Sequence, residues 1–90
     1  MKLVVNKCFG GFSLSDEAAK ELGVNDVYSI INRCDEHLIK MVEENTDKVS
    51  GSCSKLRVVE IPDEATDWEL NDYDGRETIT YVVDGRLHHV

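Results

Sequence analysis

Residues 68–90 read WELNDYDGRETITYVVDGRLHHV, and this stretch decides the fold class. Asp-Gly occurs in it twice, at 74–75 and at 84–85, and an Asp-Gly pair is a strong signal for a tight hairpin turn. We therefore expect strands over 68–72 and 78–83 around the first turn, and a last edge strand over 86–90. The C-terminal part of the chain is predicted to form an antiparallel sheet built from hairpins.

The rest of the chain is interpreted from short apolar runs, helix caps and chain breakers. We expect strands over 2–6 and 55–61, helices over 15–22 and 36–45, an extended segment over 27–31, and a loop over 45–54. Pro62 ends the second of these strands, and Gly23 and Asp35 occupy cap positions of the helices. The sum is a single compact α+β domain over residues 1–90, with an N-terminal strand, two helices and a mainly antiparallel sheet with C-terminal hairpins.

The charge of the chain is concentrated in one segment. The formal net charge is -8, and residues 60–77 hold eight acids and one base, so that this segment alone carries -7 and the rest carries -1. The sequence predicts one solvated acidic face. It also disfavours nucleic acid as a partner, because nonspecific binding to nucleic acid needs a basic surface.

Composition also sets expectations for compartment and assembly. Lys2 is followed by only three apolar residues, and no apolar run approaches the length of a membrane span, so we expect neither a signal peptide nor membrane binding. Cys8, Cys34 and Cys53 are odd in number and form no CxxC pair, which indicates reduced thiols in a cytoplasm. No cofactor or metal is expected. A chain this small gains stability by burying surface against a copy of itself, so a homo-oligomer is expected.

The most distinctive local motif is residues 6–15, which read NKCFGGFSLS. Gly10 and Gly11 lie between two phenylalanines, after a predicted strand and before a predicted helix. Such an arrangement directs backbone N–H groups at one place, which suits an anion. Two interpretations stay open: a phosphate held by these amides with Lys7 nearby, or a tight turn that packs the phenylalanines into the core.

Arginines are the other candidates for phosphate recognition, because a guanidinium group binds phosphate through two hydrogen bonds. Arg57 lies between two apolar strand residues, so it faces away from the core, and Arg33 is a second candidate. Arg76 has acidic neighbours and is interpreted as structural, while Trp68 is interpreted as a packing or interface anchor. Cys8 has no histidine tied to it by a local pattern, so nucleophilic catalysis is disfavoured.

Two pieces of the chain resemble a family of small uncharacterised proteins from tailed bacteriophages. They are VVNKCFGGFSLS at 4–15, and LRVVEIPD at 56–63 followed by Trp68-Glu69 and Tyr73-Asp74-Gly75. The tail differs, since similar proteins tend to end in His-Arg-Thr-Trp and this chain ends in RLHHV. The resemblance implies a phage setting. Small phage proteins of this kind are often expressed to disarm host defence, and several unrelated groups are homo-oligomeric sponges that trap nucleotide immune signals.

These observations lead to one preferred function and two alternatives. We expect a phage counter-defence protein that sequesters a nucleotide-derived signal, of the cyclic ADP-ribose or cyclic dinucleotide type, without turnover. The residues expected to bind it are Lys7, Phe9, Gly10, Gly11, Phe12, Ser13, Arg33 and Arg57. The alternatives are an inhibitor that binds a host protein through its acidic face, and a small nucleotide-signal hydrolase.

Overall fold

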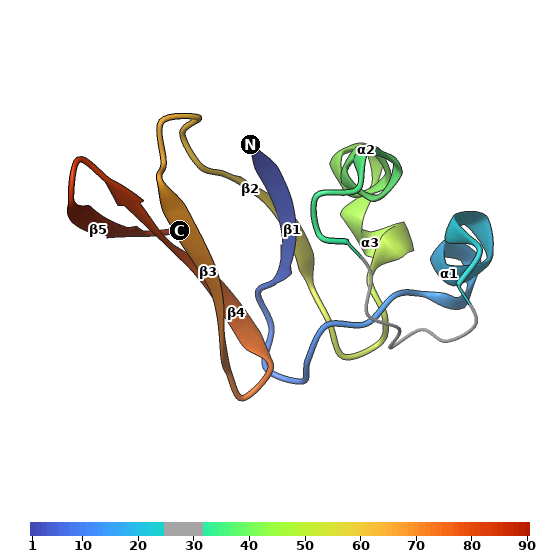
Figure 1. Cartoon of the computed structure of the whole chain (residues 1–90). Coiled ribbons are helices and arrows are strands. Elements are labelled where there is room, and N and C mark those ends of the chain that lie inside the picture. The colour runs from blue at the N-terminus through green and yellow to red at the C-terminus, as the bar shows by residue number, and fades with distance from the viewer. Residues whose placement is uncertain (25–31) are drawn as a thin grey trace.

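The computed structural model describes residues 1–24 and 32–90 (Figure 1). Five strands and three short helices follow in the order β1 (Lys2–Asn6), α1 (Asp16–Leu22), α2 (Glu36–Glu44), α3 (Thr46–Val49), β2 (Leu56–Glu60), β3 (Asp67–Tyr73), β4 (Arg76–Val83) and β5 (Arg86–His89). The α+β class is confirmed. The expected extended segment at 27–31 lies outside the described residues, because residues 25–31 are not among them.

Strand β1 is the centre of the molecule. It pairs antiparallel with β2, and this two-stranded sheet lies between the helices on one side and the sheet β3-β4-β5 on the other (Figure 1). Val4 faces the helices, whereas Leu3 and Val5 face the larger sheet, as the alternation of a strand requires. All three side chains are fully buried, so β1 serves two cores at once.

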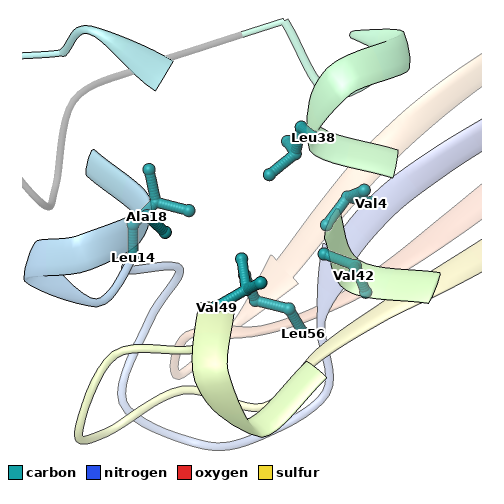
Figure 2. Close-up of a cluster of buried hydrophobic side chains, with 7 residues drawn as sticks. All are labelled: Val4, Leu14, Ala18, Leu38, Val42, Val49 and Leu56. Carbon is teal, nitrogen blue, oxygen red and sulfur yellow. The ribbon is translucent and has the colours of Figure 1, made fainter. Parts of the chain in front are cut away.

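Two buried clusters hold the three layers together. The cluster on the helix side consists of Val4, Leu14, Ala18, Leu38, Val42, Val49 and Leu56, whose side chains point toward one another in Figure 2. The cluster between the sheets consists of Leu3, Val5, Ile61 and Ile79. The expectation of one mainly antiparallel sheet is thereby refined to two separate antiparallel sheets, because β1 and β4 contact through side chains rather than through a ladder of hydrogen bonds.

Local capping chemistry sets the helix boundaries. The Ser15 hydroxyl accepts a hydrogen bond from the Ala18 N–H at the start of α1, and the Asp35 carboxylate accepts one from the Leu38 N–H at the start of α2. The prediction of a simple loop over 45–54 is wrong, because α3 lies inside it. Only Val49 of this short polar helix is buried, which leaves too little apolar pattern to detect it.

Both predicted hairpins are confirmed. Tyr73 pairs with Arg76, and Val83 pairs with Arg86, so each connection is a two-residue Asp-Gly loop. All four loop residues have positive φ, between 51° and 88°, which is the conformation that matches the twist of antiparallel strands. Among the helices of the described residues, none combines the length and apolar composition that crossing a membrane requires.

Candidate functional site

The glycine motif after β1 packs backbone to backbone against the β3–β4 turn. The Gly10 N–H donates to the Asp74 carbonyl at 3.1 Å. A methyl group added at Gly75 would collide with the Gly11 nitrogen, and one added at Gly10 would lie 2.6 Å from the Cys53 carbonyl oxygen. Gly10 and Gly75 are therefore needed for close approach between chain segments, whereas nothing lies within 4 Å of a methyl group added at Gly11.

Glu77 is the centre of a polar cluster beside this junction. Its residue is only 2 % exposed, and its carboxylate accepts two hydrogen bonds from the Arg33 guanidinium, at 2.6 and 2.9 Å, and one from the Asn6 N–H at 2.8 Å. The Arg33 guanidinium also lies 3.7 Å from the centre of the Phe12 ring. Lys7 donates from Nζ to the Glu77 carbonyl at 2.9 Å.

This cluster also closes the edge of β1 that faces away from β2. The Val4 N–H donates to the Arg33 carbonyl, the Arg33 side chain donates back to the Val4 carbonyl, and the Asn6 N–H is taken by Glu77. A strand edge with unpaired backbone groups is normally open to aggregation. Here an ion pair replaces a neighbouring strand, so Arg33 and Glu77 have a structural role.

The electrostatics of Lys7 reflect its position. Partial burial lowers the pKa of the Lys7 ammonium below 10.5, nearby Arg76 lowers it further, and Glu77 acts in the opposite direction. Lys7 and Arg76 therefore lie close enough to feel each other as like charges. Arg76, which the sequence had suggested was only structural, is thus a second cation close to Lys7.

The structure brings some of the predicted ligand-binding residues together and separates others. Lys7, Phe12 and Arg33 meet around Glu77. The carbonyl of buried Ser13 accepts from the Gly51 N–H and the Ser54 hydroxyl, and the Arg57 guanidinium contacts the Thr46 hydroxyl at 3.1 Å and the Leu56 carbonyl at 2.9 Å. Most donors of the predicted phosphate site are thus engaged by other parts of the chain. Ligand binding by these residues stays a prediction.

Phe9 differs from Phe12, which packs against the helix-side cluster, because Phe9 faces solvent; the interpretation that the turn packs both phenylalanines into the core is therefore wrong for Phe9. It is 60 % exposed and meets Tyr73, itself 75 % exposed, edge to face with 6.5 Å between the ring centres. The two rings and Arg76 line a shallow depression of about 120 Å³. Ligand pockets that enclose a drug-sized molecule measure roughly 300–1,000 Å³, so this depression offers a stacking surface and not an enclosed pocket.

A larger hollow lies around Trp68, where the chain passes from β2 to β3. It measures about 500 Å³, and its lining consists of Met1, Ile61, Pro62, Asp63, Ala65, Thr66, Asp67 and Trp68. Trp68 is 40 % exposed. The N-terminal ammonium donates to the Ile61 carbonyl at 2.8 Å and to the Asp63 carboxylate at 3.2 Å. The hollow is thus lined by apolar side chains, by the carboxylates of Asp63 and Asp67, and by the N-terminal ammonium that pairs with Asp63.

The acidic segment divides sharply by burial. Seven of its eight carboxylate residues are exposed, namely Glu60, Asp63, Glu64, Asp67, Glu69, Asp72 and Asp74, and only Glu77 is buried. Sequence reasoning treated the eight as one solvated face and missed the role of Glu77. The available signal was strand alternation, because Glu77 is two residues before Ile79 and therefore on the same inward face.

The cysteines and histidines do not assemble a metal centre in the described residues. Cys8, Cys34 and Cys53 carry no disulfide. Within residues 1–24 and 32–90, no three side chains of the metal-binding types come together. Comparison with known proteins adds no relatives: no family model matches the chain, and neither a curated protein nor a solved structure matches it.

Proposed function

We propose that this protein is a binding protein without catalytic turnover, which recognises a basic partner protein through Trp68 and the carboxylates around it. The observation that carries the proposal is an exposed tryptophan in a hollow that is lined by apolar side chains and by the carboxylates of Asp63 and Asp67. The resemblance to small tailed-phage proteins supports a host protein as the partner and inhibition as the outcome.

The arrangement matches what interface energetics require. A buried tryptophan anchor surrounded by a polar rim is the commonest form of an interaction hot spot. The rim carboxylates of Asp63 and Asp67 would speed the encounter with a positively charged surface and disfavour acidic partners. The partner side expected from this chemistry is an apolar side chain flanked by lysine or arginine.

The test uses the single tryptophan of the chain as its probe. A synthetic peptide that alternates lysine and leucine is added to the full-length protein, and the emission of Trp68 is followed during the titration. We expect a blue shift, because an apolar side chain in the hollow removes the indole from water. Raising the salt concentration should weaken binding, because the rim contribution is electrostatic.

Matched variants make this test decisive, with binding followed by fluorescence of a dye on the peptide. Trp68→Ala should weaken binding at least ~10-fold, the loss expected for an interface anchor. Asp63→Asn/Asp67→Asn, which neutralises the rim, should weaken it less, and Glu21→Gln/Glu44→Gln, with the same change of net charge among the helices, should leave it unchanged. If all three variants bind the peptide equally, Trp68 and its rim are not the site and the proposal fails.

A nucleotide-derived ligand is the second candidate, and the Phe9–Tyr73 pair with Arg76 and Lys7 beside it favours this candidate. Aromatic faces stack bases, and the two cations would attract phosphates. The protein is incubated with cyclic dinucleotides and cyclic ADP-ribose derivatives, washed, denatured and analysed by mass spectrometry. Intact ligand that is lost in Phe9→Ala and kept in Leu87→Ala supports sequestration. A converted product indicates hydrolysis, and absence of any bound nucleotide rejects this candidate.

A further inference from the structure

The face of the sheet β3-β4-β5 that points away from β1 packs against neither buried cluster of the described residues, and Phe9 lies over one end of it beside Tyr73. The pairing registers place the odd-numbered residues of β3 and β5 and the even-numbered residues of β4 on this side, which we call the outer face. The opposite face carries Leu70, Ile79 and Tyr81, which pack toward β1. No apolar residue of the outer face belongs to either buried cluster or packs against one, and Leu87 is 68 % exposed.

The outer face is polar in its middle, with Arg76 at one end and the exposed carboxylates of Asp67 and Glu69 toward the other. Across the middle, the Asn71 amide donates to the Thr80 hydroxyl at 2.7 Å, and His89 Nδ1 lies 3.1 Å from the same hydroxyl. At the end nearest the β3–β4 turn, Arg76 pairs with Tyr73 across the strands. At the far end, Asp67 lies opposite Val82 of β4, which pairs in turn with Leu87 of β5.

We propose that the outer face binds a second copy of this chain, with the strands of the two copies antiparallel. A two-fold axis across the middle of the face brings the cationic aromatic end of each copy onto the far end of the other. Each strand then lies on the same strand of the partner, so that Arg76 of β4 reaches the partner's Val82 and Asp67, and Tyr73 of β3 lies beside the partner's Asp67. Sheets that pack face to face in this way align within about 30° of each other.

Charge complementarity selects this orientation over its alternative. With the strands parallel, the central strand β4 would again lie on the partner's β4, so Arg76 would meet its own copy, and like charges in contact are unfavourable. Within the described residues, neither Arg76 nor Asp67 has an ion-pair partner, so both are available for the contact. The antiparallel interface is isologous, and its ion pair forms twice.

The size of the face sets the strength of the dimer. Seven residues at ~3.4 Å and three strands at ~4.8 Å give a footprint of roughly 24 by 14 Å. That is well below the ~800 Å² per partner of a stable interface, so a weak, concentration-dependent dimer is expected, with a dissociation constant on the order of 100 µM. The inference does not rest on the proposed function, because Trp68 lies on the opposite face of the sheet and Asp67 is the one residue that takes part in both, so peptide binding is compared in the Arg76→Glu variant.

The experiment is sedimentation equilibrium of the full chain over a concentration series that brackets this dissociation constant. Arg76→Glu and Asp67→Arg each place like charges across the interface, and each should raise the dissociation constant at least ~10-fold. The double variant Arg76→Glu/Asp67→Arg restores opposite charges and should return the constant to within ~3-fold of the wild-type value. Arg86→Glu, an exposed charge reversal on the opposite face of the sheet, is the matched control and should change nothing.

Each outcome decides the proposal. Weaker dimerisation in both single variants, together with a near wild-type dissociation constant in the double variant, supports the proposal. A wild-type chain that stays monomeric throughout the concentration series overturns the proposal. A dissociation constant that neither single charge reversal changes, or that the double variant does not restore, also overturns it. Circular dichroism of every variant checks folding, which these exposed positions should preserve. Peptide binding at Trp68 is measured separately, so either proposal can fail without the other.

Discussion

Arg76 and Glu77 are neighbours in strand β4, and the two faces of the sheet give them opposite environments. The Glu77 carboxylate is buried and accepts three hydrogen bonds from Arg33 and Asn6. Arg76 is exposed, and its guanidinium has no ion-pair partner among residues 1–24 and 32–90. One residue of displacement along a strand therefore separates a group that stabilises the fold from a group that is available to a partner.

The same contrast holds for the two hairpin turns. Both are Asp-Gly turns with nearly equal backbone angles, and both were predicted from the sequence. Gly75 contacts the glycine motif that follows β1, whereas nothing lies within 4 Å of a methyl group added at Gly85. Turn chemistry made the two sites alike, and only their tertiary neighbours distinguish them.

The largest expected effect on the free energy of unfolding comes from a substitution of buried Glu77. Glu77→Gln removes the negative charge that compensates Arg33, and breaking a buried pair by removal of one partner costs about 3 kcal/mol of unfolding free energy. Urea unfolding followed by circular dichroism measures this loss. Glu69→Gln, at an exposed carboxylate of β3, is the control and should stay within ~0.5 kcal/mol of wild type. Equal losses in both variants would contradict a structural role for Glu77.

A smaller effect is expected from the pair of turn glycines. Gly85→Ala should destabilise the protein by about 1 kcal/mol, the ordinary penalty for a side chain at positive φ. Gly75→Ala carries that penalty and also collides with the Gly11 backbone, so its loss should exceed that of Gly85→Ala by about 1 kcal/mol or more. The same unfolding assay compares them. Equal losses would mean that the glycine motif does not pack against the β3–β4 turn.

The smallest expected effect concerns the pKa of Lys7, which contacts Glu77 and lies near Arg76. NMR titration of the Lys7 side chain should give a pKa below the ordinary lysine value of 10.5, and Arg76→Ala should raise it, because the nearby guanidinium disfavours the ammonium. Folding favours the neutral amine here, so the Lys7 contribution to stability rises with pH between the lowered pKa and 10.5. A Lys7 pKa that does not respond to Arg76→Ala would place the two side chains further apart than described.

The predictions made from sequence succeeded where a feature depends on residues close together in the chain. The hairpin turns, the Gly23 and Asp35 caps and the strands at either side of Pro62 all follow from contacts within about four residues. The helix α3 was missed for the converse reason, because its stability comes from one buried side chain, Val49, against distant partners. The split into two sheets was also missed, since pairing patterns do not reveal which strands meet through side chains alone.

The roles of the candidate site residues were also hard to predict, because their partners lie far away in the sequence. The motif NKCFGGFSLS was recognised as unusual, but its backbone packs closely against Gly75 and Cys53, which lie far along the chain. Lys7 and Arg33 were chosen as phosphate ligands because they are cations, and their partner Glu77 was counted among solvated acids. Tyr73 was not chosen and Arg76 was taken as structural, although both line the depression beside Phe9.

The sequence by itself determined the α+β class, the antiparallel C-terminal hairpins and the concentration of negative charge in residues 60–77, because turns, caps and charge are properties of short segments. Only the tertiary structure decided which of those charges is buried and which glycine is indispensable to packing. It also decided which face of β3-β4-β5 packs against neither buried cluster. The physical reason is that burial and pairing depend on segments brought together across 29 to 71 residues of chain, and no local pattern records such partners.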